Sequence, residues 1–340
     1  MNVLCSGQGC FNRYSGYLFR LKFIFAKVQI LKYMKTKLFG LIASSVVMAS
    51  LMLTTCGLKQ QEPQRDDPKA QVFEKHFYTA PPMPDSISFM GEKVPLHRFD
   101  VRESLERELI VNAYFHSQTI RLIKLAPRFF TQIDPILKEE RVPEDFRYLA
   151  VAESGLNPKA ASPAGAVGLW QFMKSAASDY GLEVNSEVDE RYHIEKSTRA
   201  ACRYLLRSYS KYQNWPLVAA SYNAGPASVD RQLARQKVNC YFDLLMSEET
   251  ERYVYRILAL KLILENPEMY GFRIQEDEKY PLWQTRKVEI TGPIANLADF
   301  SLSQGTNYKM LKYYNPWLRD NVLTNKTGKR YVVELPVLTD

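Results

Sequence analysis

The sequence has few of the residues that metal or redox chemistry requires. It contains five cysteines and four histidines in 340 residues, and the histidines are scattered along the chain at His76, His97, His116 and His193. Transition metals are usually held by several His, Cys or acidic side chains at short, regular spacing. We therefore predict no metal site and no cofactor, and no internal repeat suggests an array of modules.

The chain also lacks a surplus of positive charge once its first part is set aside. Lys and Arg number 45 against 37 Asp and Glu, but seven of the basic residues and none of the acidic ones lie in residues 1–55. The rest of the chain is close to neutral. A basic surface for nucleic acid is not indicated, and we expect no nucleic-acid partner.

Residues 1–55 have the anatomy of a bacterial leader. From Met34, the stretch MKTKLFGLIASSVVMASLMLTTCG has a basic start, an apolar run and a Leu-Thr-Thr-Cys ending. That ending resembles a lipobox with Cys56 as the lipidated residue, so we interpret residues 1–33 as an over-extended start. A transmembrane anchor is the alternative, but Phe39 to Thr55 is short for a span of about 20 residues.

The leader predicts a cell-envelope protein, an outer-membrane lipoprotein that faces the periplasm. Gly57 follows Cys56, where the sorting rule for inner-membrane retention would place an aspartate. Residues 56–94 are polar and rich in Gln, Asp, Lys and Pro, which predicts a lipidated N-terminus on a flexible tether. After the tether, the apolar pattern from Arg102 to Phe130 predicts one long amphipathic helix.

A glutamate stands at the end of the next apolar helical pattern. In EDFRYLAVAES, Phe146, Leu149 and Ala150 lie at i, i+3 and i+4 of one helix face, and Glu153 takes the i+7 position. Its carboxyl is therefore expected to point toward the core, where burial raises the pKa and suits the group to general acid catalysis near neutral pH. The alternative is a helix-terminal glutamate that turns to solvent or pairs with a nearby cation.

The residues that follow predict a break and a second helix. Gly155 can close the first helix in the left-handed conformation, and Asn157-Pro158 prevents its continuation. The stretch AVGLWQFMKSAASDYG then predicts a helix with Ser162 as its N-cap and Gly181 at its far end. The chain is expected to fold back past Glu153.

Four short motifs follow in order along the chain. They are Glu-Ser-x-x-Asn-Pro from Glu153 with Ser-Pro-Ala-Gly from Ser162, Gly-Leu-Trp-Gln from Gly168, Tyr-Asn-Ala-Gly from Tyr222 and Glu-Thr-x-x-Tyr-Val from Glu249. This set, over about residues 130–267, resembles the soluble-type lytic transglycosylases, which have a lysozyme-like catalytic domain and cleave peptidoglycan glycan strands. Trp170 stands where the family usually has methionine. The lead-in helix and the segment DERYHIEKSTRAACRYL make the chain most similar to the membrane-bound D type.

The resemblance implies a role for each motif residue. Glu153 is expected to act as acid and base. The expected substrate-binding residues are Ser162, Gln171, Tyr222, Asn223, Glu249 and Tyr253, with Tyr222 beside the scissile bond. The expected partner is the peptidoglycan glycan strand, with the membrane contacted through the N-terminal lipid.

The chain offers no obvious second catalytic carboxylate. Common glycosidases place one about 5 Å away (retaining) or about 6.5–9.5 Å away (inverting), but the acids downstream lie in a polar stretch where we expect them to be solvated. These are Asp179, Glu183, Glu187, Asp189 and Glu190. With Glu153 alone, the resemblance implies that the C6 hydroxyl of N-acetylmuramic acid attacks its own anomeric carbon and leaves a 1,6-anhydromuramoyl end.

Several of these residues have a simpler structural interpretation. Aromatic residues could stack on sugar rings, but core positions suit Phe172 and Trp215 better. Asn223 could cap a turn before Gly225-Pro226. Glu249 could occupy the first turn of a helix capped by Ser247. The two cysteines beyond Cys56 remain open between a periplasmic disulfide and free thiols; they are Cys202 and Cys240.

The C-terminal part changes character from about Pro281. VEITGPI and RYVVELP predict two strands, and the segments NLADFSLSQG and NYKMLKYYNPWL between them predict two helices. This strand-helix-helix-strand unit resembles a LysM domain, although Gly292-Pro293-Ile294-Ala295 replaces the usual Gly-Asp-Thr-Leu turn. We expect a mainly α protein: a lysozyme-like (α+β) domain at 95–280 and a small βααβ LysM-like domain at 281–340.

Three functions fit these observations. The first is a peptidoglycan lytic transglycosylase, which is a lyase. The second is a lysozyme-like hydrolase on the same fold, which needs an acidic residue and a positioned water opposite Glu153. The third is a non-catalytic cell-wall-binding lipoprotein. The four intact motifs argue against the third, because a pure binder has no need of a half-buried glutamate. The mass of the products separates the first two, since an anhydro end lacks the water that hydrolysis adds.

Overall fold

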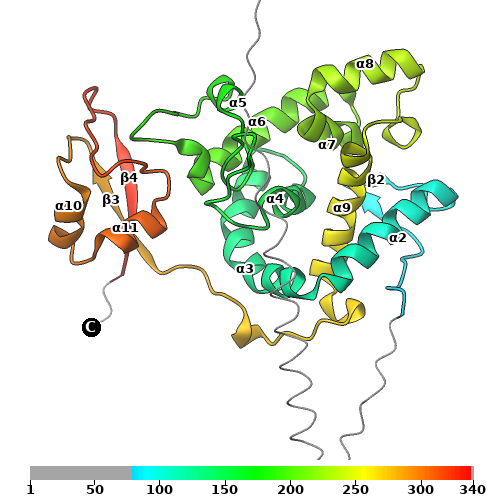
Figure 1. Ribbon diagram of the computed structural model, residues 1–340, viewed down its shortest axis with the longest axis horizontal. Coiled ribbons are helices and arrows are strands. Elements are labelled where there is room, and N and C mark those ends of the chain that lie inside the picture. Colours follow the sequence, from blue (N-terminus) through cyan, green and yellow to red (C-terminus); the bar gives the residue numbers. More distant parts are fainter. Residues whose placement is uncertain (1–78, 338–340) are drawn as a thin grey trace, which may run out of the picture. The chain divides into compact units, whose positions relative to one another are not determined.

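The computed structural model describes residues 79–337, and the predicted leader and Cys56 lie outside these residues. A helical bundle comes first and a small βααβ domain follows (Figure 1). The helices of the bundle are α2 (Phe99–Tyr114), α3 (His116–Glu139), α4 (Arg147–Ser154), α5 (Lys174–Asp179), α6 (Ile194–Tyr212), α7 (Trp215–Ala224), α8 (Pro226–Gln236) and α9 (Glu248–Glu265). Three 3-10 turns lie between these helices: η1 (Glu144–Phe146), η2 (Glu190–Tyr192) and η3 (Tyr241–Asp243). Two more follow α9: η4 (Pro267–Tyr270) and η5 (Glu276–Glu278). No helix within residues 79–337 is long and apolar enough to cross a bilayer.

The prediction of a tether up to residue 94 is wrong for its last part. Strands β1 (Ser88–Phe89) and β2 (Glu92–Lys93) form a hairpin, and Phe89 is buried in the main core. The Glu92 carboxylate accepts hydrogen bonds from the Asn214 side chain (2.6 Å) and the Trp215 backbone N–H (2.6 Å). These contacts tie the hairpin to the start of α7, because that helix end has unpaired backbone donors.

The single helix predicted for residues 102–130 is two helices. The chain leaves the helical conformation at Phe115, whose φ is −86° and ψ 59°. The Thr119 hydroxyl donates to the Asn112 carbonyl across this break (2.5 Å). Apolar periodicity on both sides of a one-residue break resembles a continuous pattern, which explains the error.

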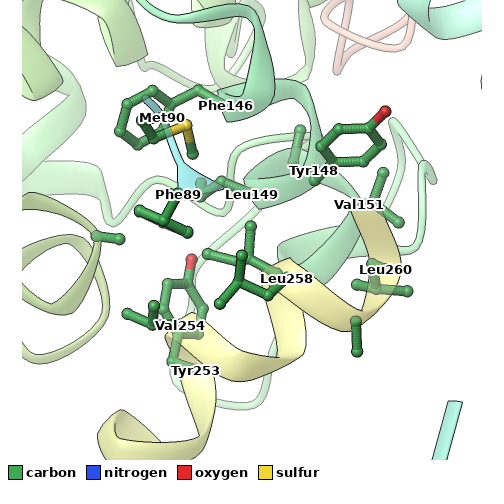
Figure 2. Packing of buried hydrophobic residues seen from close by; sticks show 14 of the residues in the cluster. Phe89, Met90, Phe146, Tyr148, Leu149, Val151, Tyr253, Val254, Leu258 and Leu260 are labelled. Carbon is green, nitrogen blue, oxygen red and sulfur yellow. The ribbon is translucent and has the colours of Figure 1, made fainter. Parts of the chain in front are cut away.

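Helix α4 ends as the sequence predicts. Gly155 has φ 57° and ψ 36°, and its N–H donates to the carbonyl of Val151. Phe146, Leu149 and Ala150 are fully buried, so the predicted inward face is confirmed. Figure 2 shows side chains of α4, α9 and the β1–β2 hairpin gathered in one cluster, including Leu149 and Tyr253. The core therefore holds the end of α4 against α9.

The helix predicted to start at Ser162 is wrong. Residues 160–172 form a folded loop closed by the bridges Ala161↔Val167 and Val167↔Phe172, and helix α5 covers Lys174–Asp179 alone. Gly165 (φ 87°) and Gly168 (φ 81°) have positive φ, and the backbone of Arg191 lies so close that a Cβ on Gly168 would overlap its carbonyl oxygen. A helix cannot accommodate these conformations.

The C-terminal βααβ unit has the predicted order. Strands β3 (Thr285–Ile290) and β4 (Tyr331–Pro336) pair antiparallel with Val288 opposite Val333, and between them lie α10 (Leu297–Ser303) and α11 (Tyr308–Tyr314). Asn315 is 1% exposed; its side chain donates to Glu334 O (2.6 Å) and accepts from Glu334 N–H (2.8 Å). This pair of hydrogen bonds joins the end of α11 to β4.

The βααβ unit is joined to the segment 183–193 of the bundle. Val188 and Tyr192 belong to the same buried cluster as Trp317 and Leu318. The N–H of Asp189 donates to the Trp317 carbonyl (2.9 Å), and the N–H of Arg319 donates to the Glu187 carbonyl (2.7 Å). The C-terminal unit therefore packs on the bundle through backbone pairing as well as through apolar contact.

Candidate active site

Glu153 lies in the last turn of α4 and faces α9. The hydroxyl of Tyr253 donates a short hydrogen bond to its Oε1. Burial raises the pKa of Glu153 from 4.5 to about 7, and the charge of Glu249 adds to this, whereas the Tyr253 hydrogen bond and the charge of Arg256 lower it. The side chain keeps some solvent contact, so the group is reachable and still protonated in part at neutral pH.

Two tyrosines enclose this carboxyl. Tyr253 is 2% exposed, and burial beside Glu153 raises its pKa well above 10. Tyr222 donates from its hydroxyl to the Trp170 carbonyl (2.7 Å), and burial followed by the charge of Glu153 raises its pKa too. Both phenols therefore stay protonated and act as hydrogen-bond donors.

Asn223 and Glu249 lie beside one another through the first turn of α9. Asn223 Oδ1 accepts from the Thr250 hydroxyl (2.8 Å), and Glu249 pairs with Arg256 Nη1 (3.0 Å). Ser247 occupies the N-cap position of α9, but its hydroxyl contacts the Thr250 hydroxyl (3.1 Å) and makes no capping hydrogen bond to the helix backbone. The charge of Glu249 raises the pKa of Glu153.

Ser162 and Gln171 lie on the folded loop 160–172 rather than on a helix. Ser162 Oγ accepts from the Ala166 N–H (3.0 Å), and Gln171 Nε2 donates to the Gly168 carbonyl (2.8 Å). Neither contacts Glu153 by a hydrogen bond among the described residues. The Tyr222 to Trp170 hydrogen bond joins their loop to the tyrosine beside Glu153, so all seven predicted site residues belong to one connected region.

The aromatic residues of the loop and α7 serve the core. Phe172 and Trp215 are buried, as the core interpretation predicts, and Trp170 is fully buried with its indole N–H donating to Thr198 Oγ1 (2.9 Å). Trp170 is thus a packing residue that holds the loop to α6. Cys202 and Cys240 are both free thiols.

The expectation that the downstream acids are solvated is wrong for two of them. Asp189 is 6% exposed and Glu190 is 3% exposed. Glu190 pairs with Lys196 (2.5 Å) and with Lys329 of the C-terminal unit (3.2 Å). The Asp189 carboxylate forms a two-point pair with Arg191, through Nε (2.9 Å) and Nη2 (2.8 Å). Buried charges are retained in cores when they are paired in this way.

Arg191 is a residue that the sequence reasoning missed. Its Nη1 donates to the carbonyls of Gly165 (3.1 Å) and Phe172 (3.1 Å), so one guanidinium joins the interior of the loop that carries Gln171 to its C-terminal end. The Asp-x-Arg spacing within DERYHIEKSTRAACRYL was a usable signal, because alternate residues can bring opposite charges together at a turn. Nothing local in the sequence indicates which carbonyls the arginine reaches.

A network of ion pairs on α2 and α9 was also not predicted from the sequence. Glu108 of α2 is 1% exposed and pairs with Arg252 (2.6 Å) and Arg256 (3.7 Å). Arg256 in turn pairs with Glu249. The network places the positive charge of Arg256 where it favours the ionised form of Glu153.

Comparison with known proteins gives the class of the chain. Residues 133–241 match the Transglycosylase SLT domain, and residues 286–338 match the Soluble lytic transglycosylase C-terminal LysM-like domain. The chain thus has a transglycosylase SLT domain and a LysM-like C-terminal domain, and these two matches support a lyase that acts on peptidoglycan. The mainly α fold, with an SLT domain followed by a small βααβ domain, is confirmed.

Comparison with individual proteins gives more specific similarities. The chain is 28% identical over 315 residues to Membrane-bound lytic murein transglycosylase D of Escherichia coli K12, covering 86% of this chain and 67% of the relative, and it matches the protein of that name from E. coli O6:H1 equally. Among solved structures, the lytic transglycosylase Slt of Pseudomonas aeruginosa has a TM-score of 0.35 at 22% identity. The 70 kDa soluble lytic transglycosylase of E. coli has a TM-score of 0.36 at 24% identity. These two matches cover 46% and 47% of this chain and 28% of each solved chain.

Proposed function

We propose that the protein cleaves the β-1,4 bond between N-acetylmuramic acid and N-acetylglucosamine and leaves a 1,6-anhydromuramoyl end, with Glu153 as acid and then as base. The observation that carries this proposal is the enclosed Glu153 carboxyl, with a pKa raised to about 7 and a tyrosine hydroxyl on one oxygen. A general acid works best when its pKa lies near the working pH.

The first step moves one proton and breaks one bond. Protonated Glu153 gives its proton to the glycosidic oxygen, the bond from that oxygen to the anomeric carbon breaks, and the acetamido carbonyl of the same sugar supports the electron-poor carbon. Glu153 is then an anion. Its Tyr253 hydrogen bond and the charge of Arg256 stabilise that anion.

The second step returns the enzyme to its starting state. Ionised Glu153 takes the proton of the C6 hydroxyl, whose oxygen bonds to the anomeric carbon and closes the anhydro ring. No water is consumed. In this proposal Tyr222 lies beside the scissile bond and the remaining five residues hold the strand: Ser162, Gln171, Asn223, Glu249 and Tyr253.

Mass spectrometry of digested sacculi tests this chemistry. Muropeptides released by the purified enzyme should carry anhydro ends, which are lighter by one water than hydrolysed ends, and Glu153→Gln should abolish their release while the variant stays folded and binds glycan. Reducing ends would instead make the protein a hydrolase and direct attention to Glu249 as the second carboxylate, since its charge acts on Glu153. Persistent anhydro products from the variant would remove Glu153 from the acid and base role.

We also propose that the protein is an outer-membrane lipoprotein that faces the periplasm, with lipid on Cys56. The Leu-Thr-Thr-Cys ending of the leader and Gly57 support this proposal. Cys56→Ala should prevent lipid attachment and release the protein from membrane fractions. A variant that stays in the membrane with an uncleaved leader would favour the transmembrane alternative.

A further inference from the structure

A small pocket lies directly after the helix that carries Glu153. It has a volume of about 150 Å³ and lies between α3, the segment Leu156–Lys159, and the aromatic residues Trp283 and Tyr313 of the C-terminal part. Pockets that enclose a whole small ligand usually measure about 300–1,000 Å³. This one has room for the end of a ligand rather than for all of it.

The lining of this pocket contains three cations and no acid. They are Arg121, Arg128 and Lys159. Arg121 donates to the Gly155 carbonyl (3.1 Å) and Arg128 to the Pro281 carbonyl (2.9 Å), while the Lys159 ammonium lies 5.0 Å from the centre of the Tyr313 ring. None of the three has an ion-pair partner among residues 79–337.

The charge of Arg319 adds to the positive potential at Lys159. Partial burial lowers the pKa of Lys159, and the charge of Arg319 lowers it further. Arg319 also lies near Lys312, whose pKa burial lowers first and Arg319 second. Cations that repel one another in the free protein are stabilised by a bound anion, so the pocket is complementary to negative charge.

The walls favour a planar anion. Arg128 stacks over the Trp283 ring, 5.3 Å from its centre, and Asn157 Oδ1 accepts from the Lys159 backbone N–H (3.0 Å), which fixes the backbone of the lysine. A guanidinium presents a planar fork of donors that matches a carboxylate. Apolar walls exclude water and strengthen the ion pair.

We propose that this pocket binds a carboxylate of the stem peptide attached to the glycan strand, and the proposal rests on the function proposed above. The stem peptide extends from the muramic acid ring and bears free carboxylates, and the pocket follows Glu153 by a few residues along the chain. The strand would thus be recognised by the charge of its peptide as well as by its sugars. The C-terminal domain takes part, because Tyr313 forms one wall.

Two forms of the same substrate test this inference. One is peptide-bearing glycan strands, and the other is the same strands with their carboxylates converted to amides. We expect the wild type to prefer the untreated strands about tenfold in kcat/KM, on the scale of one charge-assisted hydrogen bond. The variant Arg121→Gln/Lys159→Gln should bring this ratio close to one.

A matched control removes the same two charges elsewhere. Arg102 on α2 and Lys309 on α11 are exposed, so Arg102→Gln/Lys309→Gln should keep the preference of the wild type. Circular dichroism and the unfolding midpoint establish that both double variants are folded. Equal preference in the pocket variant and the control, or no preference in the wild type, would overturn the proposal.

A binding experiment separates this inference from the catalytic one. Free stem tetrapeptide should bind to Glu153→Gln in calorimetry, and Arg121→Gln/Lys159→Gln in that background should abolish the binding. This measurement does not depend on the products formed. If inorganic phosphate displaced the tetrapeptide at equal concentration, the pocket would be a general anion site and the assignment to the stem peptide would be wrong.

Discussion

Glu153→Gln should make the protein more stable at alkaline pH while it removes activity. The carboxyl of Glu153 has a pKa of about 7 in the folded chain, against an ordinary value of 4.5. Below pH 4.5 the group is protonated in both the folded and the unfolded chain. As the pH rises toward 7 the unfolded chain releases this proton first, so the folded state loses relative stability until it too has ionised.

The size of the effect follows from the two pKa values. The interval between 4.5 and about 7 corresponds to about 3 kcal/mol at about 1.4 kcal/mol per pH unit. The glutamine side chain of the variant does not ionise, and its carbonyl oxygen can still accept the Tyr253 hydrogen bond. The variant should therefore match the wild type at pH 4 and exceed its free energy of unfolding by up to about 3 kcal/mol at pH 8.

Urea unfolding at pH 4, 6 and 8 measures this difference. Both proteins share every other titrating group, so the difference between their free energies of unfolding depends on Glu153 alone. It should open between pH 4.5 and 7 and then stay constant. A gap that is the same at pH 4 and pH 8 would refute the reasoning, because it would mean that the carboxyl is not desolvated in the folded state.

Three further predictions concern the surroundings of Glu153. In the wild type, kcat/KM should fall as the pH rises through about 7, because Glu153 ionises there. In Tyr253→Phe this fall should occur at higher pH, because the hydrogen bond that the variant lacks stabilises the Glu153 carboxylate. A fall at lower pH would contradict the role of Tyr253 as a donor to that carboxylate. Arg191→Ala leaves Asp189 buried without its partner and should cost about 3–5 kcal/mol in urea unfolding; a cost below about 1 kcal/mol would show that the pair is dispensable. Gly168→Ala should lower both stability and kcat, since its Cβ would overlap the Arg191 carbonyl oxygen; unchanged kinetics would mean that the loop 160–172 adapts freely.

The sequence predicts the end of α4 well because the signals there are local. The i, i+3, i+4, i+7 face fixes which way Glu153 points, and Gly155 supplies the left-handed residue that ends the helix. The βααβ order is likewise predicted by the spacing of apolar residues and by turn residues over short distances. Each of these features depends on residues within one or two turns of one another.

The features that the sequence did not reveal depend on distant partners. Loop 160–172 has an apolar pattern that favours a helix, but Arg191 holds its carbonyls from outside. Asp189 and Glu190 look solvated in a polar stretch, yet Glu190 is paired with Lys329 from 139 residues away. The break at Phe115 is similar, since periodicity alone does not register a one-residue interruption.

The two domains are connected through the segment 183–193, which also holds the loop 160–172. Asp189 uses its N–H to bond to Trp317 and its carboxylate to orient Arg191, and Arg191 holds Gly165 and Phe172. Val167, at the middle of that loop, packs in the same buried cluster as the C-terminal domain. These hydrogen bonds and apolar contacts form one continuous chain from the LysM-like domain to the loop 160–172. The C-terminal domain therefore packs against the segment that holds the loop 160–172.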